Sequence, residues 1–234
     1  MTSRHEMKPI VLLLGIYVDP VETRMNELLE SLERNIANED INEIHVFVEE
    51  DSRDISQKLI LYSERFSEKY SKLLKHEKVI AVERGKRTFF SEYFDYANKN
   101  LIDKVVVIAN SDIYFDHTIG LLKDADLEGV FICLAKYEGI PPKLWDPNIS
   151  QDVWAFSTPI RVLDSHFTNG CPGCDNVLAY FAHSAGMQVI NPCLSIIAYH
   201  LDNRTRDRRY GPPIPGLGGL GVPPSTIDEL RPNG

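Results

Sequence analysis

Residues 105–116 read Val-Val-Val-Ile-Ala-Asn-Ser-Asp-Ile-Tyr-Phe-Asp, and this stretch decides the fold class. Its first part is a mainly β-branched apolar run without a polar face. That is the pattern of a strand buried on both sides in a mostly parallel sheet. The run then breaks abruptly into Asn110, Ser111 and Asp112. The pattern therefore predicts a central strand of an α/β protein that ends at a polar loop.

The polar loop Asn110-Ser111-Asp112 falls where open α/β sheets bind their ligands, just beyond the carboxyl end of a strand. A carboxylate there can hold a hard divalent cation or a sugar hydroxyl. Asn, Ser and Asp also favour turns and helix N-caps, so the loop can equally be a plain turn before the next helix. The stretch alone leaves both interpretations open.

Strands and helices alternate along the first half of the chain. Apolar runs predict strands over residues 10–17, 44–48 and 79–82 and from residue 105. The first helix has a start signal, with Asp19 as its N-cap and Pro20 at its first position. A later helix is expected after Thr88.

Strand-like runs dominate the second half. They cover residues 130–134, 153–156 and 194–200. One helix is expected there, with Asp175 as its N-cap and Gly186 as its stop. The order of elements predicts a three-layer α/β/α fold with a mostly parallel central sheet and a mixed edge.

The bulk composition limits the function classes. The chain has 234 residues, of which 43% are apolar, and a net charge of −9. This charge would repel a nucleic-acid backbone, although it allows one small phosphorylated ligand. No apolar stretch approaches the roughly 20 residues of a membrane helix, and the first residues lack a signal-peptide pattern. The sequence therefore predicts a cytoplasmic protein with no membrane span.

The composition changes after His200. Arginines cluster between residues 204 and 209, and residues 211–224 contain ten Gly or Pro residues. Such a stretch continues neither a sheet nor a helix. We therefore expect one domain over residues 1–203 and a tail over residues 204–234 that packs little.

Four short motifs resemble a known family. They are Ala-Asn-Ser-Asp-Ile-Tyr-Phe-Asp, Ser-Gln-Asp-Val-Trp, Pro-Gly-Cys-Asp-Asn and Asn-Pro-Cys-Leu-Ser-Ile-Ile-Ala-Tyr-His-Leu. Their order and spacing resemble the GT-A class of nucleotide-sugar glycosyltransferases, and more narrowly a group of small single-domain transferases that includes viral ones. The resemblance covers residues 10–202. It implies the GT-A fold, a nucleoside-diphosphate-sugar donor and a carbohydrate or glycan acceptor.

The resemblance also implies a divalent cation. In the GT-A class an Asp-x-Asp motif follows a central strand, where its first carboxylate meets the donor ribose and its last binds the metal. Asn110-Ser111-Asp112 matches this motif except for the asparagine, whose amide can still bond a ribose hydroxyl but carries no charge. His200 matches a late histidine of the metal shell. We therefore expect Mn²⁺ or Mg²⁺ at Asp112 and His200, and the histidine favours Mn²⁺. Alternatively, His200 only makes a backbone hydrogen bond at a strand end.

The catalytic base has two candidates. Asp175 matches the acidic residue that inverting GT-A enzymes place at a helix start, where it takes the proton of the acceptor hydroxyl. The helix N-terminus is expected to favour its ionised form. Asp152 is the rival base or an acceptor-hydroxyl ligand, and a plain N-cap is the other interpretation of Asp175. Trp154 can face a sugar ring, but a tryptophan in a strand is usually a core residue.

Three residues are expected at the donor. By resemblance, Arg87 contacts the nucleotide or its diphosphate, and a solvated surface arginine is the alternative. By fold analogy, Tyr17 stacks on the base and Glu49 bonds it. The basic cluster after residue 203 either closes over the diphosphate or is a charged tail.

The four cysteines fall into two groups, two in apolar runs and two in a Cys-x-x-Cys segment. Cys133 and Cys193 lie in apolar runs and are expected to be buried packing residues. Cys171-Pro-Gly-Cys174 can be half a zinc site or a redox pair, but no second pair stands at zinc-finger spacing. A tight Pro-Gly turn that presents Asp175 accounts for it better.

Two other functions stay open. A sugar-phosphate nucleotidyltransferase has the same fold class, but its usual Gly-rich loop after the first strand is replaced by residues 17–22, Tyr-Val-Asp-Pro-Val-Glu. The second alternative is a non-catalytic module that binds a nucleotide sugar or a partner.

Overall fold

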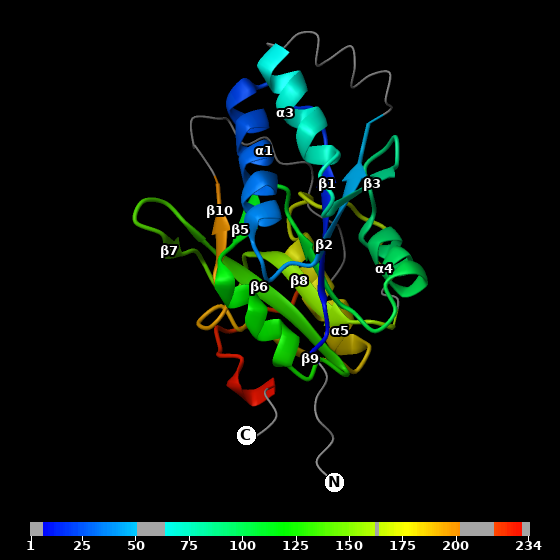
Figure 1. Ribbon diagram of the computed structural model, residues 1–234. Coiled ribbons are helices and arrows are strands. Elements are labelled where there is room, and N and C mark those ends of the chain that lie inside the picture. The colour runs from blue at the N-terminus through cyan, green and yellow to red at the C-terminus, as the bar shows by residue number, and fades with distance from the viewer. Residues whose placement is uncertain (1–6, 51–63, 162–163, 202–217, 231–234) are drawn as a thin grey trace.

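The computed structural model describes residues 7–50, 64–161, 164–201 and 218–230 (Figure 1). The elements in chain order are β1 (Ile10–Ile16), α1 (Glu22–Ala37), β2 (Glu43–Val48), α3 (Glu64–Leu74), β3 (Val79–Glu83), α4 (Phe90–Asn100), β4 (Val105–Ala109), β5 (Ile113–Phe115), η1 (His117–Asp124), β6 (Val130–Glu138), β7 (Lys143–Leu144), β8 (Gln151–Ser157), α5 (Cys174–Ser184), β9 (Gln188–Ile190), β10 (Ala198–His200) and η2 (Asp228–Leu230). Strands and helices alternate up to β4, as expected.

The strands form one sheet in the order β3-β2-β1-β4-β8-β6-β10-β5, with β7 and β9 paired to β6. The strands β3, β2, β1 and β4 run parallel, and β8 is antiparallel to both of its neighbours, β4 and β6. At the other end β10 runs parallel to β6, while β5 is antiparallel to β10. The predicted mostly parallel sheet with a mixed edge is confirmed.

Both faces of the sheet are buried under helices. Along β1, Leu12 packs into one core with residues of α1 and α3, whereas Val11 and Leu13 pack into a second core with α4 and α5. Helices α1 and α3 lie together on one side of the sheet in Figure 1. A central strand with two buried faces has no room for a polar side chain, which explains the apolar runs of β1 and β4. Trp154 is fully buried between β8 and α4, as a core residue.

The sheet gathers the ends of many strands at one edge. The carboxyl ends of β1, β2, β4, β6 and β10 point the same way, because these strands run parallel to one another. Strand β8 runs oppositely, so its amino end, with Asp152, lies at that same edge. The backbone of Asn110 donates to the carbonyl of Asp152 over 3.0 Å and joins the two loops. Polar residues far apart in the sequence therefore meet there.

Some element boundaries differ from the expectation. Helix α1 begins at Glu22, because Asp19 accepts a hydrogen bond from the backbone of Val21 and so forms a turn before the helix. Helix α4 begins after Phe89, whose N–H donates to Glu92, rather than at a Thr88 cap. Strand β10 covers only the end of the expected run 194–200, since residues 195 and 196 turn back onto the carbonyl of Pro192.

Residues 218–230 pack against the domain, contrary to the expected loosely packed tail. Val222, Ile227 and Leu230 are buried. The backbone of Val222 donates to the Asn148 carbonyl over 2.9 Å. Val222 is an isolated apolar side chain between Gly221 and Pro223, and Ile227 and Leu230 lie at the short turn η2; such single side chains can be buried without a long regular element. The arginine cluster lies outside the described residues, and the division at residue 203 stays a prediction.

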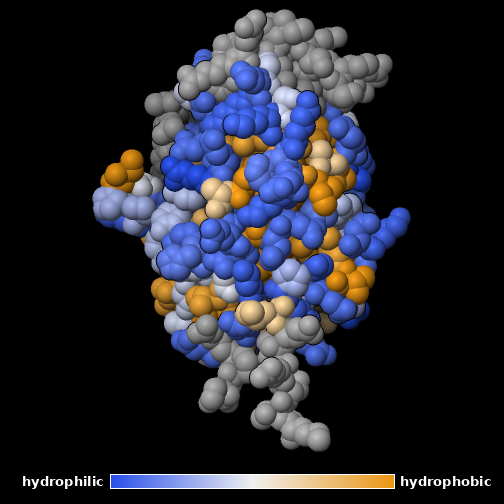
Figure 2. Space-filling model, in the orientation of Figure 1, coloured by the Kyte–Doolittle hydropathy of each residue, from blue (hydrophilic) through white to orange (hydrophobic). Residues whose placement is uncertain are grey.

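Hydrophilic residues cover most of the face shown in Figure 2. The hairpin of β6 and β7 projects from the side of the molecule, and Ile140 in its turn is fully exposed. Among the described residues, no helix combines the length and the apolar character needed to cross a bilayer.

Candidate functional site

Two joined cavities open at the edge where the strand ends meet. The larger has a volume of about 550 Å³ and is lined by Asn110, Asp112, Asp152, Asp175 and His200, among others. The smaller, of about 190 Å³, is lined by Glu49 and Arg87, among others. Four further residues line both cavities: Tyr17, Arg24, Asn169 and Gly170. All eight residues singled out from the sequence therefore line one or both cavities.

Asp112 lies at the junction of the cavities, between Arg24 and His200. Its Oδ2 is 2.6 Å from Nη1 of Arg24 and 3.1 Å from Nε2 of His200. Burial alone would raise the pKa of the Asp112 carboxyl, but the charges of His200 and Arg24 hold that pKa well below its usual range. Asp112 is therefore held as a carboxylate.

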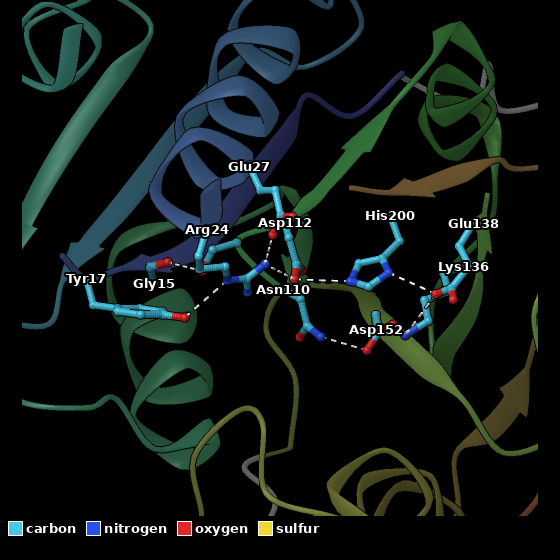
Figure 3. A network of polar contacts seen from close by, with 11 residues as sticks. Gly15, Tyr17, Arg24, Glu27, Asn110, Asp112, Lys136, Glu138, Asp152 and His200 are labelled. Atoms are coloured by element: carbon cyan, nitrogen blue, oxygen red, sulfur yellow. Dashed lines mark hydrogen bonds and ion pairs between the residues drawn. The ribbon is translucent and has the colours of Figure 1, made fainter. Parts of the chain in front are cut away.

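A chain of ion pairs leads from Asp112 across the larger cavity (Figure 3). Nδ1 of His200 is 3.0 Å from Oε2 of Glu138, and Nζ of Lys136 is 4.0 Å from that same oxygen. Lys136 also lies 2.5 Å from Oδ2 of Asp152. The amide of Asn110 donates to Oδ1 of Asp152 over 2.6 Å. His200 thus bridges two carboxylates, which is more than the single backbone bond considered from the sequence.

Asp175 stands in a different electrostatic setting. It is the second residue of α5, after Cys174, so the N-cap is Gly173 rather than Asp175 itself. Burial raises the pKa of the Asp175 carboxyl to about 6, and the nearby charge of Asp152 adds to the effect. The backbone hydrogen bond at the helix start does lower the pKa of Asp175, as expected, but desolvation and the like charge of Asp152 outweigh it.

The smaller cavity is built around Glu49 at the end of β2. Its Oε1 accepts from the backbone of Thr88 over 3.0 Å, and its Oε2 is 3.2 Å from Nε of Arg87. Burial raises the pKa of the Glu49 carboxyl. A Cβ at Gly15 would lie 2.7 Å from Oε1 of Glu49, so a larger residue there would force the Glu49 carboxyl to move. The Arg87 guanidinium lies 5.7 Å from the ring centre of Tyr17 and completes the wall.

The Cys171-Pro172-Gly173-Cys174 segment forms a tight turn. The backbone of Cys174 donates to the Cys171 carbonyl over 3.0 Å, and Gly173 adopts a φ of 83° that favours glycine. The Cys174 thiol is 3.5 Å from Oδ1 of Asp175, and burial raises the pKa of this thiol well above its usual value. A turn that presents Asp175 describes the segment well. Cys133 and Cys193 are fully buried, as expected.

Asp112 and His200 fit a divalent cation that takes two ligands from the protein. Oδ1 of Asp112 is buried and has no hydrogen-bond partner among the described residues, so it is available to a ligand. The part of the chain that the structure describes holds no group of three or more His, Cys, Asp or Glu side chains suited to a metal. The remaining positions would fall to phosphate oxygens and water, which is usual for Mg²⁺ sites.

Three charged residues of the network were not singled out from the sequence. Arg24 belongs to α1, and Lys136 and Glu138 belong to β6; all three are buried. A signal for them exists. Lys136 and Glu138 follow an apolar strand run, and Arg24 directly precedes the apolar face of its helix. A charge inside an apolar element is rarely buried without a partner.

Comparisons with known proteins identify the fold. No protein-family model and no curated protein matches the sequence. A mannosyltransferase from Pyrobaculum calidifontis, solved with GDP-Man and Mn²⁺, aligns with a TM-score of 0.52 and 13% identity over 85% of this chain and 59% of that chain. GalNAc-T7, solved with UDP, GalNAc and Mn²⁺, aligns with a TM-score of 0.52 and 10% identity over 84% of this chain and 44% of that chain.

A third match is too weak to support an inference about the fold. A 4-diphosphocytidyl-2C-methyl-D-erythritol synthase from Anaerococcus prevotii aligns with a TM-score of 0.35 and 15% identity, over 64% of this chain and 70% of that chain. The chain spans 59% and 44% of the two transferases, which are GT-A-type glycosyltransferases. At such identities the likeness concerns the fold alone. The protein has a GT-A-like α/β fold of the nucleotide-diphospho-sugar transferase type.

Proposed function

We propose that the protein is a metal-dependent, inverting glycosyltransferase that moves a sugar from a nucleoside-diphosphate-sugar donor to a hydroxyl of a carbohydrate acceptor. The observation that carries the proposal is the pair of joined cavities at the strand ends of a GT-A-like sheet, with Asp112 at the junction and Asp175 in the larger cavity. The motif resemblance to small single-domain transferases agrees with it and stays a prediction.

The donor nucleoside belongs in the smaller cavity. Glu49 offers carboxylate oxygens to the base, and Tyr17 offers a ring face. Asn110 lies in the wall of both cavities, and its amide oxygen is buried without a hydrogen-bond partner among the described residues. This oxygen can accept from a ribose hydroxyl. Arg87, with a half-exposed side chain, can turn from Glu49 to the nucleotide.

The divalent cation, Mn²⁺ or Mg²⁺, belongs at Asp112 and His200. When bound, it would neutralise the negative charge that develops on the leaving diphosphate. Glu138 fixes the ring of His200 through Nδ1 and thereby directs Nε2 toward Asp112. The protein thus supplies both ligands and their orientation.

Asp175 is the better candidate for the catalytic base. Both oxygens of Asp152 are engaged, one by Lys136 and one by Asn110, so this residue orients its neighbours or the acceptor. Asp175 has a pKa of about 6 and is basic enough to share a proton near neutral pH. As the acceptor oxygen bonds the anomeric carbon, the bond to the diphosphate breaks and the hydroxyl proton passes to Asp175. One such displacement inverts the anomeric configuration.

A thermal-shift panel tests the proposal first. Ligands that bind the native state raise the unfolding temperature, by an amount that grows with the logarithm of their excess over the dissociation constant. We expect one of UDP, GDP, dTDP and CDP to stabilise the protein, more strongly with Mn²⁺, and Asp112→Ala to lose the effect. Stabilisation by none of them, with or without Mn²⁺, would contradict the proposal. Pyrophosphate release from a nucleoside triphosphate and a sugar phosphate would instead identify a nucleotidyltransferase.

A further inference from the structure

Arg24 is the one cation among the described residues that lines both cavities. Arg87 lines only the smaller cavity and Lys136 only the larger. If the proposed function holds, a donor with its base in one cavity and its sugar in the other must pass its two phosphates along the shared wall. That wall includes Arg24 and Asp112, and Figure 3 shows the two side chains pointing toward each other.

The guanidinium of Arg24 is held by two acids and one hydroxyl. Nη1 is 2.6 Å from Asp112 and 3.0 Å from Oε2 of Glu27, one turn along α1. Nε donates to the hydroxyl of Tyr17 over 3.4 Å. The side chain is only 11% exposed, so water screens its charge weakly. Nη1 and Nε are engaged by these partners, so a two-point contact with a phosphate through Nη1 and Nη2 forms when Nη1 exchanges its bond to Asp112 for the phosphate.

Arg24 and a divalent cation need the same carboxylate. Arg24 already bonds Oδ2 of Asp112, and the other oxygen, Oδ1, has no hydrogen-bond partner in the part of the chain that the structure describes. A cation added at Asp112 would stand close to the guanidinium, and like charges at such distances repel. A diphosphate relieves this repulsion because it offers negative charge to both. Each ligand then strengthens the binding of the other, and the coupling is reciprocal.

We propose that Arg24 is the protein's own cation for the donor diphosphate and that, without a nucleotide, it competes with the divalent metal for Asp112. This inference rests on the proposed function and adds a residue to it. Arg24 weakens the binding of free metal and strengthens the binding of nucleotide. The two effects have opposite signs, so a general loss of structure cannot imitate them.

Calorimetric titrations of Arg24→Gln test the proposal. One series adds UDP, GDP, dTDP, CDP or inorganic pyrophosphate in the presence of a chelator, and the other adds Mn²⁺ alone. We expect at least about tenfold weaker binding of the diphosphate ligand and several-fold tighter binding of Mn²⁺. Arg34→Gln is the matched control, since Arg34 lies on the same helix but is exposed and pairs with Glu30 at the surface. It should change neither affinity.

An unchanged diphosphate affinity or an unchanged Mn²⁺ affinity in Arg24→Gln overturns the proposal. If that variant does not fold, Arg24→Lys replaces it: the retained charge should keep the Mn²⁺ affinity of the wild type, while loss of the two-point contact weakens diphosphate binding several-fold. Equal diphosphate binding by Arg24→Lys and the wild type also overturns the proposal. A wild type that binds no diphosphate ligand in the presence of Mn²⁺ would instead contradict the proposed function itself.

Discussion

Asp112, which is buried, and Asp175, which is half-buried, line the same cavity, yet their pKa values move in opposite directions. Asp112 has Arg24 and His200 against its oxygen, so its pKa falls although burial opposes this. Asp175 has burial and the charge of Asp152 acting together, so its pKa rises to about 6. The comparison shows that neighbouring charge, rather than burial, separates a carboxylate suited to cations from one suited to protons.

The largest effect is expected on substitution of Asp112, at the junction of the two cavities. Asp112→Ala should abolish detectable sugar transfer, because it removes a metal ligand and leaves Arg24 without one of its carboxylates. Initial rates with a nucleotide sugar measure the loss. Asp116→Ala is the matched control, since Asp116 follows in the same segment but bonds Thr118 instead. Transfer at a rate near that of the wild type in Asp112→Ala would contradict the assignment.

Substitution of Asp175 should lower the rate of sugar transfer and leave the affinity for the donor nucleotide unchanged. Asp175→Asn should lower kcat by about 10²–10⁴-fold, the range for loss of a general base. The dissociation constant of the nucleoside diphosphate should stay the same, since Asp175 lines the larger cavity and not the smaller one, where the nucleoside is placed. Asp152→Asn is the informative comparison: a larger fall in kcat there, at unchanged donor affinity, would make Asp152 the base.

The pH dependence sharpens the contrast between Asp112 and Asp175. Because Asp175 must be ionised to accept a proton and its pKa is about 6, kcat should fall as the pH decreases through about 6. The charge of Lys136 lowers the pKa of Asp175, so Lys136→Met should move this limb to higher pH. Values of kcat between about pH 4.5 and 8 locate the acidic limb in the wild type and in Lys136→Met. A limb that does not move in Lys136→Met would show that another group titrates.

The elements that carry Asp112 could be predicted from local sequence. Strand β4 is apolar on both faces, and only a buried strand allows that pattern, so the position of Asn110 and Asp112 at its end followed directly. Strand order also explains why His200 and Asp152 arrive there. Domain-level prediction was weaker at the chain end, where Val222 and Ile227 are buried without any periodic pattern.

The electrostatics of the site could not be predicted in the same way. The pKa of Asp175 depends on Asp152, which reaches the same edge only because β8 runs antiparallel to its neighbours. The role of Arg24 could not be predicted, because the apolar pattern of α1 shows which face of the helix is buried but not which loop lies next to its first turn. Contacts between distant segments determine the pKa values of the site carboxyls, and local helix or strand propensity contains no information about such contacts.

The smallest effect is on stability, and its sign follows from the raised pKa of Asp175. Below the ordinary value of 3.8 the carboxyl is protonated in both the folded and the unfolded chain. As the pH rises, the unfolded chain ionises first, so the stability contributed by protonated Asp175 is lost through a folded pKa of about 6. Asp175→Asn cannot ionise and should therefore be more stable than the wild type at neutral pH, by about 1–3 kcal/mol.

Urea unfolding at about pH 7.5 and about pH 4 tests this sign. The stability difference between Asp175→Asn and the wild type should be present at the higher pH and nearly vanish at the lower. Asp116→Asn controls for the exchange of a carboxylate for an amide away from the cavity. If Asp175→Asn is less stable at both pH values, Asp175 is a structural acid at the start of α5. If it is more stable only at neutral pH and has lost kcat, the fold sacrifices stability to keep an ionisable group beside Asp152, which a merely structural carboxylate does not explain.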